Sequence, residues 1–281
     1  MLKQTFPINV DDTINSGQVF LWEKHDKTWY GINGNDVLAV SSDAEIFSYS
    51  KKSYDFFRND DDFERILRDI NRDHIVRSAV KRFSGLRLLR QDPFQCYISF
   101  IVSANSSIQN IKSTLQKICK KFGSKIRFNG NYFYLFPDPK KIATAKKHEL
   151  QSCGLGYRAK AVKKAAEIVV SGEIDFNFLK KSDYHVAKES LLKVFGIGNK
   201  VADCILLFSL EKSDSFPLDR WMLRVLQKYY SDKFELNMKT LTEKRYENLH
   251  KEIVKYFGPY AGYSQQFLFK MERELNQKKW L

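Results

Sequence analysis

The segment LLKVFGIGNKVADCILLF, residues 191–208, places two glycines around one apolar residue, between two stretches of helical periodicity. Glycine adopts positive φ angles and leaves neighbouring backbone N–H groups uncovered. The second helix begins at once, so its unpaired N–H groups and the positive end of its dipole face the same space. Gly196 and Gly198 therefore predict an anion-binding hairpin suited to a nucleic-acid phosphate, with Ile197 filling the interface between the helices. An ordinary helical hairpin is the alternative.

Lys200 falls in the first turn of that second helix. A cation there is disfavoured by the helix dipole by up to ~1 kcal/mol. The same field destabilises the ammonium form and raises the share of neutral amine. Because a neutral amine can attack carbon and form a Schiff base, Lys200 is a candidate nucleophile. A lysine that only contacts a DNA phosphate would give the same pattern.

Asp219, in the segment FPLDRWMLRV, directly precedes a further helical pattern and is predicted to cap it. The helix that carries Lys200 runs ~15 Å away from it, at ~1.5 Å per residue. The linking residues 211–218 can span ~26 Å at ~3.3 Å each, so Asp219 can return to the hairpin. A carboxylate beside an amine suits a reaction that develops positive charge on a sugar, such as N-glycosidic cleavage. A purely structural cap is the alternative.

The charge of the chain is unevenly distributed over its 281 residues. Residues 1–85 carry 12 Lys and Arg against 14 Asp and Glu, whereas residues 86–281 carry 35 against 19. A basic balance confined to one part is expected for a protein with a polyanionic partner, although a well-solvated lysine-rich surface has the same composition. No apolar run approaches ~18 residues and the start lacks a signal-peptide pattern. We therefore expect an intracellular protein without a membrane span, cytoplasmic and nucleoid-associated if it is prokaryotic.

The four cysteines lie far apart in the sequence, and no pair has the spacing of metal ligands. We expect reduced thiols in a chain of this length, and neither a metal site nor a cofactor. These residues are Cys96, Cys119, Cys153 and Cys204.

The periodicity of the chain predicts an α+β fold. Short alternating runs, QVFLWEK, TWYGING and DVLAVSS, predict a small antiparallel sheet, with a tight turn at Asn33–Gly34. Helical patterns start near residue 53, and we place the end of this N-terminal sheet domain at residue 85. Residues 86–281 read as helical throughout and form the larger domain, with the hairpin at about 183–211. Asp92 is predicted to cap one helix and Gly123 to end the next.

Several separate motifs then occur in one order along nearly the whole chain: NSGQVFLW, LRLLRQDPFQC, FIVSANSSI, GLGYRAKAV, FGIGNKVADC, PLDRWM and GPYAGYSQQFLF. In this the sequence resembles the helix–hairpin–helix (HhH-GPD) DNA glycosylases. More narrowly, it resembles the 8-oxoguanine DNA glycosylase/lyase family that has an N-terminal sheet domain. The resemblance implies excision of 8-oxoguanine from duplex DNA and a lyase step without a cofactor, by a protein that we expect to be a monomer.

The resemblance also implies roles for single residues. Lys200 would attack the sugar carbon C1′ and Asp219 would stabilise the charged sugar. Gly17 would offer its carbonyl to the extra N–H of the oxidised base, which must first leave the stack. Cys204 and Phe269 would pack on the two faces of the base, and Gln265 would bond its Watson–Crick edge. From the residues alone, Gly17 would be a turn glycine, and Cys204 and Phe269 would be ordinary core.

Further residues of the matching motifs would contact DNA. Asn105, Tyr157 and Arg158 lie in turns between helices and would fill the gap left by the base and contact the opposite strand. Trp221 stands where the eukaryotic relatives carry a histidine that assists at the phosphate. Asn110 stands where they carry an arginine that reads the opposite cytosine, so we expect weaker selectivity for cytosine.

Two alternatives remain open. Glycosylases of alkylated bases have a similar sheet domain and keep the aspartate, but generally lack a lysine in the hairpin. Endonuclease III and adenine glycosylases usually end in four clustered cysteines, which this sequence lacks.

A helix–hairpin–helix protein that only binds DNA would use Lys200 as a phosphate contact. Replacing Lys200 by glutamine discriminates, because binding to damaged DNA should then survive while cleavage is lost.

Overall fold

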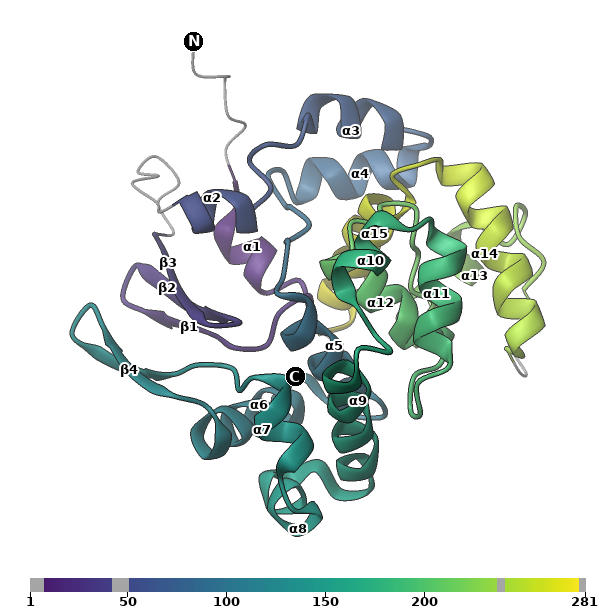
Figure 1. Cartoon of the computed structure of the whole chain (residues 1–281). Coiled ribbons are helices and arrows are strands. Elements are labelled where there is room, and N and C mark those ends of the chain that lie inside the picture. The colour runs from purple at the N-terminus through teal and green to yellow at the C-terminus, as the bar shows by residue number, and fades with distance from the viewer. Residues whose placement is uncertain (1–7, 42–50, 237–240, 278–281) are drawn as a thin grey trace.

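The computed structural model describes residues 8–41, 51–236 and 241–277. Near the N-terminus, the three predicted strands are present as one antiparallel sheet in the order β1-β2-β3 (Figure 1). Trp22 pairs with Gly31 and Thr28 with Ser41, and the second turn falls at Gly34 with a φ of +60°. The strands are β1 (Trp22–His25), β2 (Thr28–Asn33) and β3 (Asp36–Ser41).

One face of this sheet is covered by α1 (Val10–Ile14) and α2 (Lys51–Phe56), which close a small aromatic core. Trp22 stacks on Phe56 with ring centroids 5.3 Å apart. Gly31 leaves room for this tryptophan, since a Cβ there would lie 2.0 Å from the indole. Trp29, Leu38 and Val40 of β2 and β3 are buried in this core, whereas β1 buries only Trp22.

The next two helices, α3 (Phe63–Ile70) and α4 (His74–Arg82), pack along the last helix, α15 (Ala261–Gln277). Their apolar side chains belong to the large core of the helical body, not to the sheet core. The expected domain boundary at residue 85 stays a prediction, since these helices join the two parts through a shared core.

The remaining helices form a body around α5 and α12, which pack against each other at its centre (Figure 1). Asp92 caps α5 by accepting a hydrogen bond from the Gln95 backbone N–H at 2.8 Å, and Gly123 follows the last residue of α6, both as predicted. The helices are α5 (Pro93–Ser103), α6 (Ile108–Phe122), α7 (Pro139–Thr144), α8 (Lys147–Leu150), α9 (Ala159–Ser171), α10 (Phe176–Lys181), α11 (Tyr184–Leu192), α12 (Asn199–Ser209), α13 (Arg220–Tyr229) and α14 (Glu243–Phe257).

One element differs from the expectation of helix throughout residues 86–281. A two-stranded antiparallel hairpin, β4 (Lys125–Phe128) and β5 (Asn131–Tyr134), follows α6. Its turn is Asn129–Gly130, with φ angles of +47° and +81°. The expectation of a helix was wrong for these residues, because an Asn-Gly pair between aromatic residues favours a tight turn between two strands.

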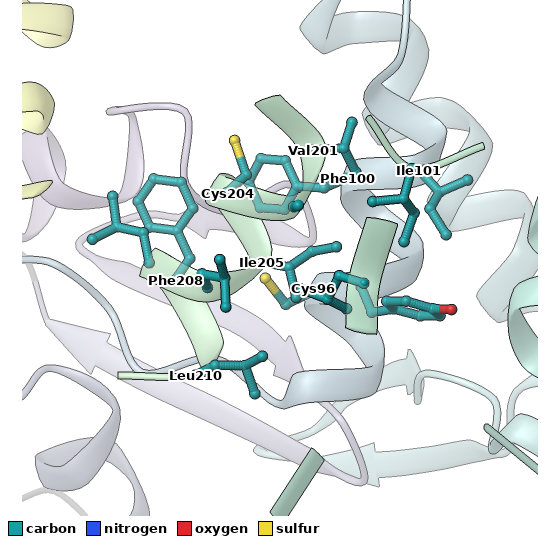
Figure 2. Packing of buried hydrophobic residues seen from close by; sticks show 14 of the residues in the cluster. Cys96, Phe100, Ile101, Val201, Cys204, Ile205, Phe208 and Leu210 are labelled. Carbon is teal, nitrogen blue, oxygen red and sulfur yellow. The ribbon is translucent and has the colours of Figure 1, made fainter. Parts of the chain in front are cut away.

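The helix that carries Lys200 is fixed by its packing against α5. Phe100 stacks on Phe208, with centroids 5.4 Å apart and planes 17° from parallel. Figure 2 shows the side chains of the two helices interleaved: Cys96, Phe100 and Ile101 from α5 with Val201, Cys204, Ile205 and Phe208 from α12. Because both helices are buried over most of their length, the first turn of α12 is held in a fixed place. All four cysteines are buried free thiols, as predicted.

Candidate active site

The predicted hairpin is present between α11 and α12. Gly196 has a φ of +92°, and a Cβ there would lie 2.7 Å from the Cβ of Ala161 on α9, so both backbone angle and packing require glycine. Ile197 is buried between the helices. Gly198 precedes α12 without a side-chain cap, and a Cβ there would meet nothing within 4 Å. The first N–H groups of α12 are therefore open to an anion.

Lys200 lies in the first turn of α12 and is partly exposed. Its Nζ is 5.4 Å from the centroid of the Phe100 ring. Cys204, one turn further along, is 3% exposed. Burial raises the pKa of its thiol to about 12, and the neighbouring Lys200 only partly opposes this. The Cys204 thiol is thus uncharged and lies next to the Lys200 amine.

Asp219 caps α13, as predicted, by accepting a hydrogen bond from the Met222 N–H at 2.9 Å. Burial raises the pKa of its carboxyl group. The bond from Met222 and the charges of Lys200 and Arg273 act in the opposite direction. The structure thus brings Asp219 back to the hairpin as the chain length allowed. The charges of Lys200 and Asp219 are close enough to interact.

A buried network connects the hairpin with the segment that leads to Asp219. Its centre is the fully buried Asp203 on α12, which accepts hydrogen bonds from Tyr184 at 2.7 Å and from Tyr246 at 2.6 Å. Lys188 donates to the same carboxylate at 3.2 Å. The Tyr246 hydroxyl also accepts the backbone N–H of Leu218, at 3.0 Å. One carboxylate thus ties α11, α12 and α14 to the residue before Asp219.

Two of the residues predicted to bind the base, Gly17 and Phe269, come together where the loop after α1 meets α15. Gly17 has a φ of +87°, and a Cβ there would lie 3.1 Å from Phe269 and 3.0 Å from Arg273. Gln265 is 4% exposed, and its Oε1 has no hydrogen-bond partner in the described part of the chain. Gln266 docks α15 on this loop by donating to the Ser16 carbonyl at 3.0 Å. Gly17 therefore has a contact and an angle that only glycine satisfies.

Arg273 is a member of this group that the sequence analysis did not select. Its guanidinium lies 5.4 Å from the Phe269 ring centroid and contributes to the electrostatics of Asp219. In the sequence it belongs to the charged run KMERELNQKK, which resembles a solvated helix face. Arg273 follows Phe269 by four residues, so both lie on one face of the helix. This spacing could have indicated Arg273 as a neighbour of the predicted base-binding residue.

The residues expected to contact the opposite strand lie in two adjoining turns. Asn105 is exposed with a φ of +50°, next to Ala104, whose carbonyl accepts a hydrogen bond from Arg158 at 2.8 Å. Tyr157 is 71% exposed, and the Arg158 guanidinium lies 5.4 Å from its ring centroid. An exposed aromatic ring beside a cation is a stacking surface for a base.

The two substituted positions flank these groups. Trp221 lies in the first turn of α13, half-buried, with the Arg224 guanidinium 5.2 Å from its ring centroid. Asn110 is exposed in the first turn of α6. Within the described segments, no three His, Cys, Asp or Glu side chains gather as metal ligands would, and no helix is long and apolar enough to cross a membrane.

Comparison with protein-family models gives two matches that together cover most of the chain. Residues 98–252 match the model of the HhH-GPD superfamily base excision DNA repair proteins. Residues 2–97 match the 8-oxoguanine DNA glycosylase N-terminal domain. The chain belongs to the HhH-GPD superfamily. Its N-terminal part is the domain that accompanies the 8-oxoguanine branch of that superfamily.

Relatives of this HhH-GPD protein have names that agree with the family. A probable N-glycosylase/DNA lyase from Methanothermobacter thermautotrophicus is 31% identical, over 76% of this chain and 70% of its own. The N-glycosylase/DNA lyase OGG1 of Arabidopsis thaliana is 27% identical, over 92% and 75%. The structure of Clostridium acetobutylicum 8-oxoguanine glycosylase/lyase, in complex with DNA that has cytosine opposite 8-oxoguanine, superimposes with a TM-score of 0.85 at 28% identity. That superposition covers 96% of this chain and 93% of the clostridial one.

Proposed function

We propose that the protein is a bifunctional DNA glycosylase and abasic-site lyase that excises 8-oxoguanine from duplex DNA. The observation that carries this proposal is the position of Lys200, in the first turn after the glycine hairpin and within electrostatic reach of Asp219. The N-glycosylase/DNA lyase relatives and the clostridial 8-oxoguanine enzyme support the substrate and the lyase step.

The chemistry follows from these two groups. Neutral Lys200 attacks C1′ of the flipped nucleotide, and the bond from Nζ to C1′ forms as the bond from C1′ to the base breaks. The base leaves with the bonding electron pair and takes up a proton that Nζ loses. Asp219, ionised, stabilises the positive charge that develops on the sugar and on Nζ. Its Oδ1 is already held by the Met222 N–H, so the carboxylate does not have to reorient during the step.

The lyase step uses the same covalent bond. A second proton passes from Nζ to O4′ as the C1′–O4′ bond breaks, which opens the sugar ring and converts the adduct into an imine. The imine acidifies the hydrogens on C2′, and removal of one of them expels the 3′ phosphate as the C3′–O bond breaks. No step in this sequence requires a metal or a cofactor.

The base pocket accounts for the choice of lesion. The Gly17 carbonyl would accept the N7–H that 8-oxoguanine has and guanine lacks. Phe269 and Cys204 would cover the two faces of the base, and the free Oε1 of Gln265 would accept from its Watson–Crick edge. We further propose that the enzyme acts as a monomer on intracellular duplex DNA that contains an oxidised purine.

Borohydride trapping tests the proposal. The wild type, Lys200→Gln and a control, Lys251→Gln, are incubated with a duplex that carries one 8-oxoguanine opposite cytosine. Lys251 is exposed on α14 and has the same charge. We expect a covalent adduct for the wild type and for Lys251→Gln only. Release of the base without an adduct would indicate a glycosylase that uses water. Neither product would indicate a DNA-binding module.

A second assay tests the opposite-base prediction from Asn110. Excision of 8-oxoguanine opposite each of the four bases should show weaker preference for cytosine than an arginine at this position would give. A steep preference for cytosine would contradict the prediction.

A further inference from the structure

Arg273 is a cation at the edge of the proposed base pocket, where its charge acts on the Phe269 ring and on Asp219. It lies one turn after Phe269 on α15, and its Nη1 is 3.0 Å from the place of a Cβ on Gly17. Among the described residues, no side chain or backbone group forms a hydrogen bond or an ion pair with it. The other cation of this turn, Lys270, is by contrast paired with Asp12 at 3.0 Å and Glu274 at 2.7 Å.

Arg273 and Gly17 line the same cavity. A cavity of about 250 Å³ is lined by Gly17, Ile108, Lys112, Lys270 and Arg273, with Ile14, Asn15, Val19 and Glu274 completing its wall. Because Gly17 and Arg273 lie side by side in this wall, a group bound to the carbonyl of one is within reach of the other.

This arrangement costs stability. Arg273 is half-buried, and burial lowers the pKa of its guanidinium, an effect that the Asp219 charge only partly opposes. A charged side chain that loses water without gaining a hydrogen bond is unfavourable. Such a group is maintained where it gains its partner from a ligand.

We propose that Arg273 donates a hydrogen bond to the oxygen on C8 of the flipped base, beside the N7–H that Gly17 would accept. This inference rests on the proposed function. N7 and C8 are bonded neighbours, so two adjacent protein groups would read two adjacent changes in the base. Guanine has neither the C8 oxygen nor the N7 hydrogen, and would leave both protein groups unpaired.

The base is favoured over a backbone phosphate as the partner of Arg273 because of its neighbours. Gly17 and Phe269 both contact Arg273, and both are residues that would contact the base. The phosphates stay outside the pocket with the sugar chain when a base is flipped. A phosphate contact is the principal competing result in the experiment below.

The experiment compares Arg273→Met, Arg273→Lys and a control, Arg68→Met, on two duplexes. Arg68 is an exposed arginine on α3. One duplex carries 8-oxoguanine opposite cytosine and the other a preformed abasic site. Loss of a charge-assisted hydrogen bond should lower single-turnover excision of 8-oxoguanine by about 10- to 100-fold in Arg273→Met. Cleavage of the abasic site, which needs no contact with a base, should fall much less than excision, Arg273→Lys should recover part of the excision rate, and Arg68→Met should equal the wild type.

A base analogue sharpens the result. 8-Thioguanine keeps the N7–H but offers a weaker acceptor on C8, so the penalty of Arg273→Met should be smaller on it. Removal of an unpaired charge should also leave the melting temperature of Arg273→Met no lower than that of the wild type, so a folding defect is not expected to obscure the comparison.

Three results would overturn the inference. Equal losses on both duplexes would assign Arg273 to a phosphate, and an unchanged rate would give it no role. A lower melting temperature together with an equal loss on both substrates would make it structural. If the wild type cleaves only abasic DNA, the proposed function itself fails; if the wild type excises 8-oxoguanine and Arg273→Met does so equally, only this inference fails.

Discussion

Replacing Tyr246 by phenylalanine should separate the stability of the fold from the positioning of Asp219. The lost hydroxyl donates to Asp203 at 2.6 Å and accepts from the Leu218 N–H at 3.0 Å, and all three groups are buried. A hydrogen bond to a charged group contributes ~1.5–3 kcal/mol and a neutral one ~1 kcal/mol. The free energy of unfolding should therefore fall by about 3 kcal/mol.

The activity should fall as well, because Leu218 directly precedes Asp219. A displacement of a catalytic group by ~1 Å can cost ~100-fold in rate, and Asp219 is proposed to be such a group. We expect single-turnover excision by Tyr246→Phe to slow by about 10- to 100-fold at a temperature where the variant is folded. Its affinity for DNA that carries an uncleavable abasic analogue should not change, since the network lies in the interior.

Tyr97→Phe is the matched control for this experiment. Tyr97 is fully buried, but its hydroxyl makes only one long bond, 3.5 Å to the Ala165 carbonyl. It should lose less than about 1 kcal/mol and retain its rate. If Tyr246→Phe is destabilised as expected but excises at the wild-type rate, the network is structural only and the reasoning is wrong.

Three further predictions follow from the site and its buried groups. Gly17→Ala should lower excision strongly while the fold survives, because a φ of +87° is strained for alanine and its methyl group would press on Phe269 at 3.1 Å and Arg273 at 3.0 Å; excision and circular dichroism measure the two effects. Asp219→Asn keeps the helix cap but removes the charge, so it should lose about 100-fold or more in kcat. Because burial raises the folded-state pKa of Asp219, its ionised form opposes folding at neutral pH, and the Asn variant should melt no lower than the wild type at pH 7. His250, stacked on Tyr184, has a pKa lowered to about 4 by burial, so its stabilising effect is complete above its ordinary pKa of 6.5 and is lost as pH falls towards 4. That loss amounts to about 3 kcal/mol, and urea unfolding of His250→Phe between pH 7 and pH 4 should show a correspondingly weaker pH dependence.

Local rules explain the parts of the structure that the sequence predicted. The N-terminal strands carry alternating apolar residues because Trp29, Leu38 and Val40 are buried in the sheet core, and Asp92 and Asp219 precede their helices because the first N–H groups need an acceptor. The hairpin could be recognised from its glycines, because the backbone angle at Gly196 requires a glycine. Chain length alone then allowed Asp219 to return to Lys200.

The parts that were not predicted depend on partners far away in the sequence. In the sequence, Lys188 has the pattern of a solvated lysine, and only the fold places it beside Asp203 and two tyrosines. Arg273 likewise has the pattern of a charge on an exposed helix, and only the docking of α15 places it beside Gly17. Charged residues in helices carry no local signal of burial, so tertiary packing alone distinguishes these two from the other cations of the chain.

The docking of α15 on the loop at Gly17 joins segments about 250 positions apart, as the bond from Gln266 to Ser16 shows. A contact of such long range is among the last that a folding or nascent chain can form. The hairpin and Lys200, by contrast, come from the middle of the chain. During synthesis, the segment proposed to hold DNA is therefore made before the segment proposed to recognise the base. Recognition of the base would then wait until α15 docks, because only that contact brings Phe269 to Gly17.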